Sequence, residues 1–313
     1  MINIYKTNKT DNKLEETTEF NKGVWINMQN PTKEEIDKVC ESININETFI
    51  RYCLDYEEQA RIDVEDDVIL FIIDVPIVEN TEDGEVYTTI PLGMIFVRED
   101  YFITICLQEN QIITDFENNL IKNVFTHKKT RFLLQILYKN ASCFLNYLKL
   151  INKRVEVAEK ALQKSMKNQE LIRMLNLEKS LVYFSTSLRS NEVVMEKILR
   201  GKVIKLYEED EDLLEDVIVE NKQAIEMSKI YSDILSGTMD AYASIISNNL
   251  NIVMRFLASV TILLSIPTLI TGLIGMNVPI PFQGREWTFY GIIGISLVII
   301  VIVGWWLKKK DMF

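Results

Sequence analysis

Two uncharged apolar stretches near the C-terminus decide the fold: FLASVTILLSIPTLITGLI at 256–274 and FYGIIGISLVIIVIVGWWL at 289–307. Each has 19 residues, and a helix of about 20 residues crosses a hydrocarbon core of ~30 Å. A connector of only 14 residues, 275–288, separates them. The pattern predicts a two-helix membrane hairpin attached to a large soluble region.

Positive charge flanks the hairpin on one side only. Arg255 precedes the first stretch, and a lysine run at 308–310 follows the second. The connector carries a single basic residue, Arg285, beside Glu286. Because basic flanks remain in the cytoplasm, we expect cytoplasmic N- and C-termini and an outer connector. The chain is therefore predicted to be a multi-pass protein of the cell (inner or plasma) membrane with two transmembrane helices.

The rest of the chain is acidic. A net charge of −11 over 313 residues suits a soluble cytoplasmic domain and argues against nucleic acid as a partner. The expected partner of the two apolar spans is the lipid bilayer. The four cysteines form no CxxC pair, and the only histidine, His127, lies beside two lysines. Neither a zinc ribbon nor a multi-histidine metal site is expected within one chain. The N-terminus lacks the apolar run of a signal peptide.

Strand signals dominate the first ~110 residues. Runs rich in β-branched and aromatic residues start at Val68, Val86, Gly93 and Tyr101, and 31–40 predicts a short helix. Further along, no proline occurs between positions 91 and 267, which favours long helices. We expect a cytoplasmic α/β domain (1–130), a long-helix stalk region (131–251) and a transmembrane domain (252–313). The transmembrane domain is expected to contain a first span at about 254–274, an outer loop (275–288), a second span at about 289–307 and a basic tail (308–313).

One continuous helix is expected from about Asp212 to Ile274, because no strong breaker separates the acidic helical run from the first span. At 1.5 Å per residue this helix would be about 95 Å long. A lone polar helix of that length is not stable in water and needs partners along its length. We infer an oligomer whose long helices bundle around a common axis.

The first span carries a stripe of small, polar or flexible residues. At a period near 3.5 one face collects Asn251, Met254, Leu257 or Ala258, Thr261, Ser265, Thr268 and Gly272. The second span has only Ser296 as a polar residue between 291 and 303. The first span is therefore predicted to line a pore and the second to face lipid. The alternative is that small polar residues merely allow helices to pack, with their hydroxyls bonded back to their own helix.

Neither span contains a carboxylate. Proton-coupled carriers usually keep an ionisable group at membrane depth, so a passive pore is favoured over a pump. Amide and hydroxyl oxygens suit magnesium, which sheds its water reluctantly. A lining of such oxygens fits a hydrated Mg²⁺ ion, because it can hydrogen-bond to the hydration shell without removing it.

Gly275-Met276-Asn277 stands at the outer end of the first of two C-terminal spans, with a lysine-rich tail after the second and a proline-poor acidic region before both. In this arrangement the chain resembles the CorA family of magnesium channels. The resemblance rests on motifs from about residue 210 onward and on architecture before that. It continues through the segments 214–217, 231–237, 240–242 and 247–254.

The resemblance implies a funnel-shaped homopentamer: an α+β cytoplasmic domain whose long stalk helix is continuous with a two-helix transmembrane hairpin. Gly275, Met276 and Asn277 would form the selectivity filter, where Asn277 meets the hydrated ion. Mg²⁺ would pass, and Co²⁺ or Ni²⁺ as well. Asn251 matches the pore-mouth position, Met254 and Leu257 the hydrophobic constriction, and further matching pore positions are Ser265, Thr268 and Gly272.

Regulation by intracellular Mg²⁺ is also implied. In the family, Mg²⁺ bound between cytoplasmic domains holds the channel shut, and Asp216 matches the stalk aspartate of that site. Carboxylates that face each other across subunits repel, and a divalent cation bridges them. The partner carboxylate is not fixed by the sequence; Glu65, Asp66 and Asp67 are candidates. The other acids of 208–216 are interpreted as a solvated helix start.

Two departures from the family pattern stand out. Ile274 replaces the usual aromatic residue before the glycine, and Glu286 is the only acid of the outer loop, so weaker attraction of external cations is expected. Two other functions stay open: a proton-coupled Zn²⁺ transporter of the same fold and a membrane-anchored sensor or scaffold. An enzyme is not expected, because the sequence shows no phosphate loop, nucleophile–base pair or metal-ligand cluster.

Overall fold

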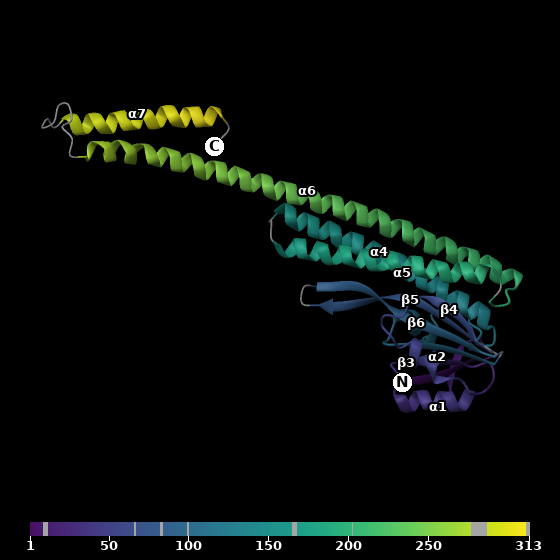
Figure 1. Ribbon diagram of the computed structural model, residues 1–313. Coiled ribbons are helices and arrows are strands. Elements are labelled where there is room, and N and C mark those ends of the chain that lie inside the picture. The colour runs from purple at the N-terminus through teal and green to yellow at the C-terminus, as the bar shows by residue number, and fades with distance from the viewer. Residues whose placement is uncertain are drawn as a thin grey trace. The chain divides into compact units, whose positions relative to one another are not determined.

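The computed structural model describes residues 1–8, 12–65, 67–81, 84–98, 100–164, 168–201, 203–276 and 287–310. Its internal contacts divide the chain into two units, Met1–Gly237 and Thr238–Phe313 (Figure 1). Helix α6 (Glu208–Ile274) contributes residues to both. The predicted functional division at residues 130 and 251 stays a prediction.

The first unit is built on a seven-stranded sheet with the order β2-β1-β3-β7-β6-β5-β4. β3 and β7 are parallel, and the other described pairs are antiparallel. The four predicted strand starts all fall in strands, but those at Val86 and Gly93 belong to one strand that runs through Pro91. The strands are β1 (Ile2–Thr7), β2 (Leu14–Thr17), β3 (Trp25–Gln29), β4 (Arg61–Glu65), β5 (Val68–Thr81), β6 (Gly84–Val97) and β7 (Tyr101–Cys106).

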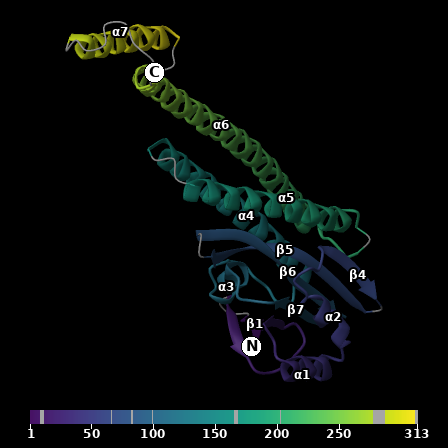
Figure 2. The same cartoon turned by 60° about the vertical axis from the view of Figure 1, so that its left-hand side comes forward.

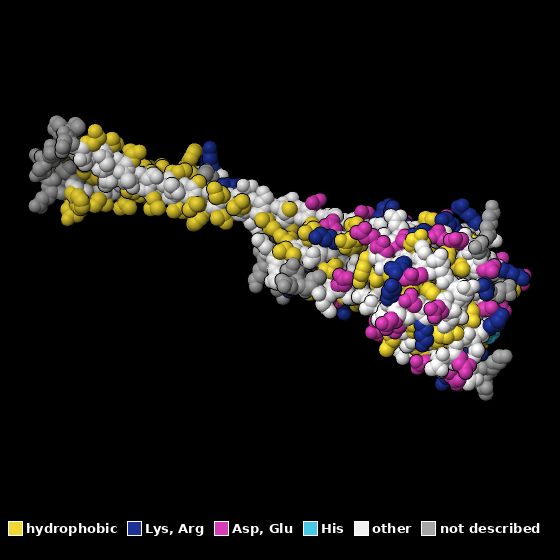
Figure 3. Space-filling model, turned by 60° about the horizontal axis from the view of Figure 1, so that its bottom comes forward, with side chains coloured by type: hydrophobic (Ala, Val, Ile, Leu, Met, Phe, Trp, Pro, Cys, Tyr) yellow, Lys and Arg dark blue, Asp and Glu magenta, His cyan; other side chains and the backbone are white. Residues whose placement is uncertain are grey.

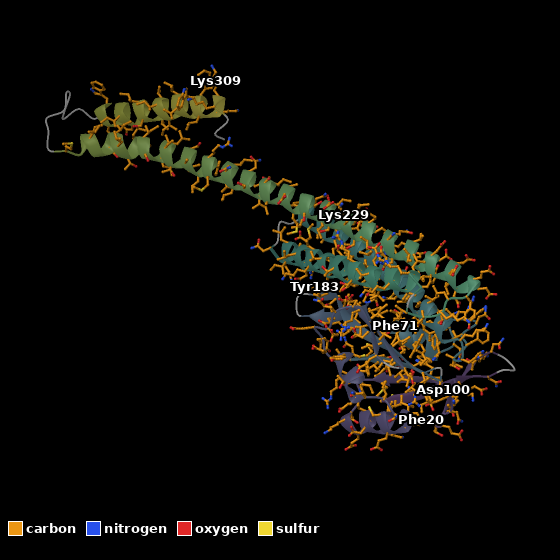
Figure 4. All side chains as sticks on the ribbon, turned by 45° about the vertical axis from the view of Figure 1, so that its right-hand side comes forward. Phe20, Phe71, Asp100, Tyr183, Lys229 and Lys309 are labelled. Carbon is orange, nitrogen blue, oxygen red and sulfur yellow. The ribbon has the colours of Figure 1, made fainter. Side chains whose placement is uncertain are left out.

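Helices cover both faces of this sheet (Figures 1 and 2). α1 and α2 pack on one face over a core that includes Val39, Ile50 and Ile72. α3, α4, α5 and the start of α6 enclose the core on the other face, where Phe71 lies (Figure 4). Besides α6, the helices of this unit are α1 (Lys33–Ile43), α2 (Glu47–Tyr52), α3 (Gln111–Glu117), α4 (Lys129–Lys164) and α5 (Asn168–Leu199).

Local chemistry explains where these helices begin and end. Thr32 and Glu35 form a capping box at the start of α1, satisfying two backbone N–H groups. Gly201, with φ of +69°, follows the end of α5, where a glycine adopts the left-handed conformation without strain. α6 begins at Glu208, four residues before the predicted Asp212, because the four acids of its first turn interact favourably with the helix dipole. This start agrees with the interpretation of 208–216 as a helix beginning.

The β5–β6 hairpin extends beyond its neighbours. β4 pairs with β5 only as far as Ile72, which leaves the following edge of β5 free. Asn191 of α5 binds this edge at Asp74: its Oδ1 accepts the Asp74 N–H at 2.8 Å, and its Nδ2 donates to the Asp74 carbonyl at 2.8 Å. Asn140 of α4 donates to the same carbonyl at 2.9 Å. Two asparagines thus replace the missing strand and fix the hairpin to the helices.

The second unit contains the rest of α6 and helix α7 (Trp287–Lys309). α6 stays helical through Pro267 to Ile274, as the continuous-helix prediction required. In the most apolar windows of the two helices only 6% and 11% of residues are buried, so neither resembles the core helix of a soluble protein. Figure 3 shows apolar side chains along this unit, whereas charged side chains gather on the first unit. The two helices confirm the predicted pair of membrane spans.

Candidate ion-conduction site

One face of α6 packs against α7. Ser259 is fully buried, and Leu263, Ile266 and Ile270 are partly buried at intervals of three or four residues. A Cβ built on Gly304 of α7 would lie 3.9 Å from Leu263 Cδ2, which is an ordinary van der Waals contact between the two helices. At 3.6 residues per turn these positions form a single stripe. Sequence reasoning did not assign Ser259 to a face, although its four-residue spacing from Leu263 is the signal for it.

The predicted pore residues lie on the opposite face of α6. With about 100° of rotation per residue, Met254 and Gly272 point about 180° away from Leu263, and Thr261 and Ser265 lie within about 20° of that direction. All the predicted positions on this face are exposed in the single chain: Asn251, Met254, Leu257, Thr261, Ser265, Thr268 and Gly272. The structure therefore brings them onto one open face, and their role as a pore lining stays a prediction.

The hydroxyl groups on this open face bond back to their own helix. Thr261 Oγ1 donates to the Leu257 carbonyl at 2.8 Å, Ser265 Oγ to the Thr261 carbonyl at 2.8 Å, and Thr268 Oγ1 to the Leu264 carbonyl at 3.1 Å. Each hydroxyl has one proton to donate, so its oxygen is left as an acceptor. Back-bonding fits the packing interpretation too. The contact with α7, however, uses Ser259 and apolar residues instead of these three.

The predicted filter begins where α6 ends. The Gly275 N–H donates to the Thr271 carbonyl at 2.8 Å, and a Cβ on Gly275 would lie 3.2 Å from that oxygen. This contact is tight for a side chain, which favours glycine there. Met276 is exposed. Asn277 and the connector as far as Glu286 lie outside the described residues, so the predicted Asn277 ring stays a prediction.

The predicted regulatory carboxylates lie in the first unit. Asp216 is exposed on α6, Glu65 is exposed at the end of β4, and Asp67 is exposed with a carboxylate oxygen 3.9 Å from Arg98 Nε. Asp66 lies outside the described residues. Within the described part of the chain, no three His, Cys, Asp or Glu side chains come close enough together to hold a metal ion. Asp216 alone is therefore not a complete metal site.

Asp74 is a partly buried acid that sequence reasoning missed. Burial raises its pKa to about 6, although a hydrogen bond from Ser187 opposes the shift. The Ser187 hydroxyl lies 2.8 Å from Thr89 Oγ1 and so joins this polar group to β6. The available signal was a single acid within the apolar run VILFIIDVPIV at 68–78.

Comparisons with known proteins agree along almost the whole chain. The sequence profile of the family described as "CorA-like Mg2+ transporter protein" matches residues 20–309. The cobalt/magnesium transport protein CorA of Methanocaldococcus jannaschii is 27% identical over 289 residues, which cover 89% of this chain and 88% of that protein. The Thermotoga maritima protein of the same name is 26% identical over 164 residues, 52% of this chain and 47% of its own length.

The solved complete structure of the Methanocaldococcus jannaschii CorA magnesium transporter has a TM-score of 0.85 against this chain at 24% identity, covering 100% of this chain and 99% of that one. This likeness confirms the predicted fold class: an α+β domain with a long helix that continues into a two-helix hairpin.

Proposed function

Because the chain belongs to the CorA-like Mg²⁺ transporter family, we propose that it is a passive channel for hydrated Mg²⁺, formed by five copies of this chain. Membership in a family of transporters confirms that the chain is not an enzyme, and the two spans are consistent with a membrane location. Divalent cations are the substrate class. Co²⁺ and Ni²⁺ are proposed as further substrates, and the Methanocaldococcus jannaschii relative is named as a cobalt/magnesium transport protein.

The open face of α6 is the observation that carries this proposal. Water molecules around a cation point their hydrogens outward, so a hydrated ion needs hydrogen-bond acceptors around it. Thr261, Ser265 and Thr268 supply such acceptors, since their protons are donated to their own helix. The lining would contact the hydration shell without removing it, which suits an ion that dehydrates reluctantly. Above this lining, Gly275, Met276 and Asn277 are the proposed filter.

A passive channel fits better than the two alternatives. Neither span contains an acidic or basic side chain, and a proton-coupled Zn²⁺ transporter is expected to need one at membrane depth. A sensor or scaffold with the hairpin as a mere anchor gives no reason for the acceptor stripe on α6. Zinc uptake that depends on a pH gradient would favour the first alternative, and a monomeric or dimeric particle the second.

Closure by intracellular Mg²⁺ is the second part of the proposal. Asp216 is exposed on α6 and so is open to a carboxylate from a neighbouring chain. Glu65 and Asp67 are exposed as well, and they remain the candidate partners together with Asp66. Two carboxylates on different chains repel, and their repulsion is offset when a divalent cation binds both. A fall in intracellular Mg²⁺ would then loosen the assembly.

Mg²⁺ uptake by liposomes containing the purified protein tests the pore. We expect Asn277→Ala, in the proposed filter, to alter Mg²⁺ flux or ion preference by about tenfold. Thr268→Val, which keeps the size of the side chain but removes the hydroxyl, should alter flux or ion preference as well. The matched control is Ser296→Ala on α7, whose hydroxyl bonds to its own helix at 2.9 Å and which is buried in the single chain, not exposed towards lipid as its span was predicted to be. If Asn277→Ala and Thr268→Val both left flux and ion preference unchanged, the proposed filter and lining would be ruled out.

The regulatory part needs a separate measurement. In liposomes loaded with millimolar Mg²⁺, we expect Asp216→Ala to keep conducting where the unmodified protein closes. Glu215→Ala is the matched control, since Glu215 is the neighbouring exposed acid of the same helix. Equal inhibition of all three proteins by internal Mg²⁺ would exclude Asp216 from the site.

A further inference from the structure

A cleft of about 730 Å³ opens in the first unit between the start of α4 and the start of α6. Its volume falls within the ~300–1,000 Å³ typical of small-molecule sites. The lining residues at the start of α4 include three basic ones, whereas the α6 side carries three acids together with Lys205, which precedes the helix. The lining consists of His127, Lys128, Lys129, Thr130, Arg131, Lys205, Tyr207, Glu208, Glu209 and Asp210. None of these residues belongs to the proposed pore or to the proposed regulatory site.

Two ammonium groups in the cleft have no acidic partner. Among the described residues, neither Lys128 nor Lys205 has a carboxylate oxygen within the 4.0 Å of an ion pair, although three acids line the same cleft. Instead Lys128 Nζ lies 5.4 Å from the centre of the Phe125 ring, and Lys205 Nζ lies 5.3 Å from that of Tyr207. Both ammonium groups are therefore available to an anion from solution.

The acidic side holds a largely buried carboxylate, that of Asp210. The Asp210 side chain is only 6% exposed, and its nearest cation, Arg131 Nη1, is 3.7 Å away. Arg131 donates its hydrogen bond to Glu209 instead, at 3.1 Å. Within the described part of the chain, the Asp210 carboxylate accepts no hydrogen bond. Its oxygens therefore keep acceptor positions that a bound cation can use.

We propose that this cleft binds a polyphosphate ester in complex with Mg²⁺, such as a nucleoside triphosphate. Lys128 and Lys205 hold the phosphate oxygens, and Asp210 with Glu209 faces the metal. The ring of Tyr207, which is 60% exposed, offers a surface for a base to stack on. A lone anion would meet the three acids, and a lone cation would meet the lysines and Arg131, so a ligand that carries both charges fits best. This site does not depend on the proposed pore.

Binding to the full chain in lipid nanodiscs tests the inference. Isothermal titration at ~0.15 M salt, which screens exposed charges, would use ATP with Mg²⁺, ATP with EDTA, tripolyphosphate with Mg²⁺, and adenosine. We expect saturable binding of one Mg²⁺–ATP per chain, weaker binding without Mg²⁺ or without the base, and none of adenosine. Lys128→Ala combined with Lys205→Ala should weaken binding at least ~10-fold, because two charge-assisted hydrogen bonds are lost.

The controls separate a specific site from general attraction to positive charge. Lys38→Ala combined with Lys229→Ala removes the same charge from exposed positions on α1 and α6 (Lys229 in Figure 4) and should leave affinity unchanged. Lys128→Arg combined with Lys205→Arg should retain binding and shows that the site tolerates substitution. Absence of saturable binding at millimolar Mg²⁺–ATP, or equal affinity in both alanine pairs, overturns the proposal.

Discussion

The two parts of helix α6 are held in different ways. In the first unit α6 bonds to α5: Asn221 Nδ2 donates to the Leu188 carbonyl at 3.0 Å, and Ser228 Oγ donates to the Leu181 carbonyl at 3.0 Å. In the second unit every residue from 243 to 258 is exposed. One helix is thus supported by its own chain along its first part and unsupported along the segment that leads into the membrane.

This difference teaches which part of the molecule is incomplete as a single chain. A helix without a packed face is marginal in water, and large apolar side chains exposed together indicate an interaction surface. We therefore expect other copies of the chain to cover this segment, in line with the oligomer predicted from the length of the helix. The exposed apolar residues are Ile245, Ile246, Leu250, Ile252, Val253, Met254, Phe256 and Leu257.

The strongest test of the comparison adds bulk to the unsupported part. Gly272 on the open face of α6 and Gly291 on α7 both have nothing within 4 Å of an added Cβ in the single chain. If copies of α6 enclose a pore, Gly272→Val narrows it, and Mg²⁺ flux into liposomes should fall at least ~10-fold. Gly291→Val should change flux less than about twofold, because lipid accommodates the added methyl groups. Similar flux in the two variants would place neither helix at a pore.

The stability of the supported part should depend on its own hydrophobic core, whatever the oligomeric state. A Cβ on Gly93 would lie 2.0 Å from Cys53 Sγ and 2.6 Å from Cys53 Cβ, inside a buried layer between β6 and α2. We expect Gly93→Ala to lower the free energy of unfolding by about 2–3 kcal/mol. Denaturant unfolding of the full chain, followed by the fluorescence of buried Trp25, measures the loss. Adding Cys53→Ala should restore part of it, and no recovery would argue against this contact.

The contribution of the contact between the β5–β6 hairpin and the helices to the free energy of unfolding should depend on pH. Asp74 has a pKa of about 6 in the fold against an ordinary value of 3.8, so the folded state disfavours its charged form. The free-energy cost of holding a charged Asp74 in the folded state is absent below about pH 4, grows between pH 4 and 6, and is constant above that range. Asp74→Asn should raise unfolding free energy by about 1–2 kcal/mol at pH 7–8. The gain should vanish near pH 4; a gain independent of pH would exclude this titration.

The smallest expected effect concerns the α5–α6 contact itself. Asn221→Ala removes the side-chain donor of the Leu188 carbonyl, which keeps only the backbone donor of its own helix, and we expect a loss of about 1 kcal/mol in unfolding free energy. Ser244→Ala, in the unsupported part, removes only a bond to the Asp240 carbonyl of the same helix. It should cost less than about 0.5 kcal/mol. Equal costs would mean that α6 is held no differently in the two units.

Much of the fold was predictable because helix and strand breakers are so unevenly distributed. The long stretch without proline gave α4, α5 and α6, and the apolar stretches gave the two spans. The separation of Val86 and Gly93 into two strands was wrong, since Pro91 lies within β6 just before its pairing with β7 begins at Leu92. A proline is tolerated where no neighbouring strand needs its N–H.

The first strands could not be predicted because their apolar pattern is incomplete. β2 buries only Leu14 along its four residues, and β4 has no fully buried residue. Both are edge strands, so their pairing depends on neighbours distant in the sequence. The stripe of polar and small residues on the open face of α6 was predictable from its helical spacing in the sequence. The structure adds that this face points away from α7. The partner carboxylate proposed for Asp216 was not predictable, because a site shared between chains would leave no local pattern in the sequence.

The bonding of the hydroxyls on α6 also bears on the sign of the ions that pass. Each water around an anion points one of its two hydrogens at the ion, so a hydrated chloride ion would offer the lone pairs on Thr261, Ser265 and Thr268 fewer outward hydrogens than a hydrated cation does. A cation with its shell meets the same lone pairs with outward hydrogens. If copies of α6 line the proposed pore, their hydroxyl oxygens would therefore favour positive over negative solutes by hydrogen bonding, without a charged side chain between residues 256 and 274.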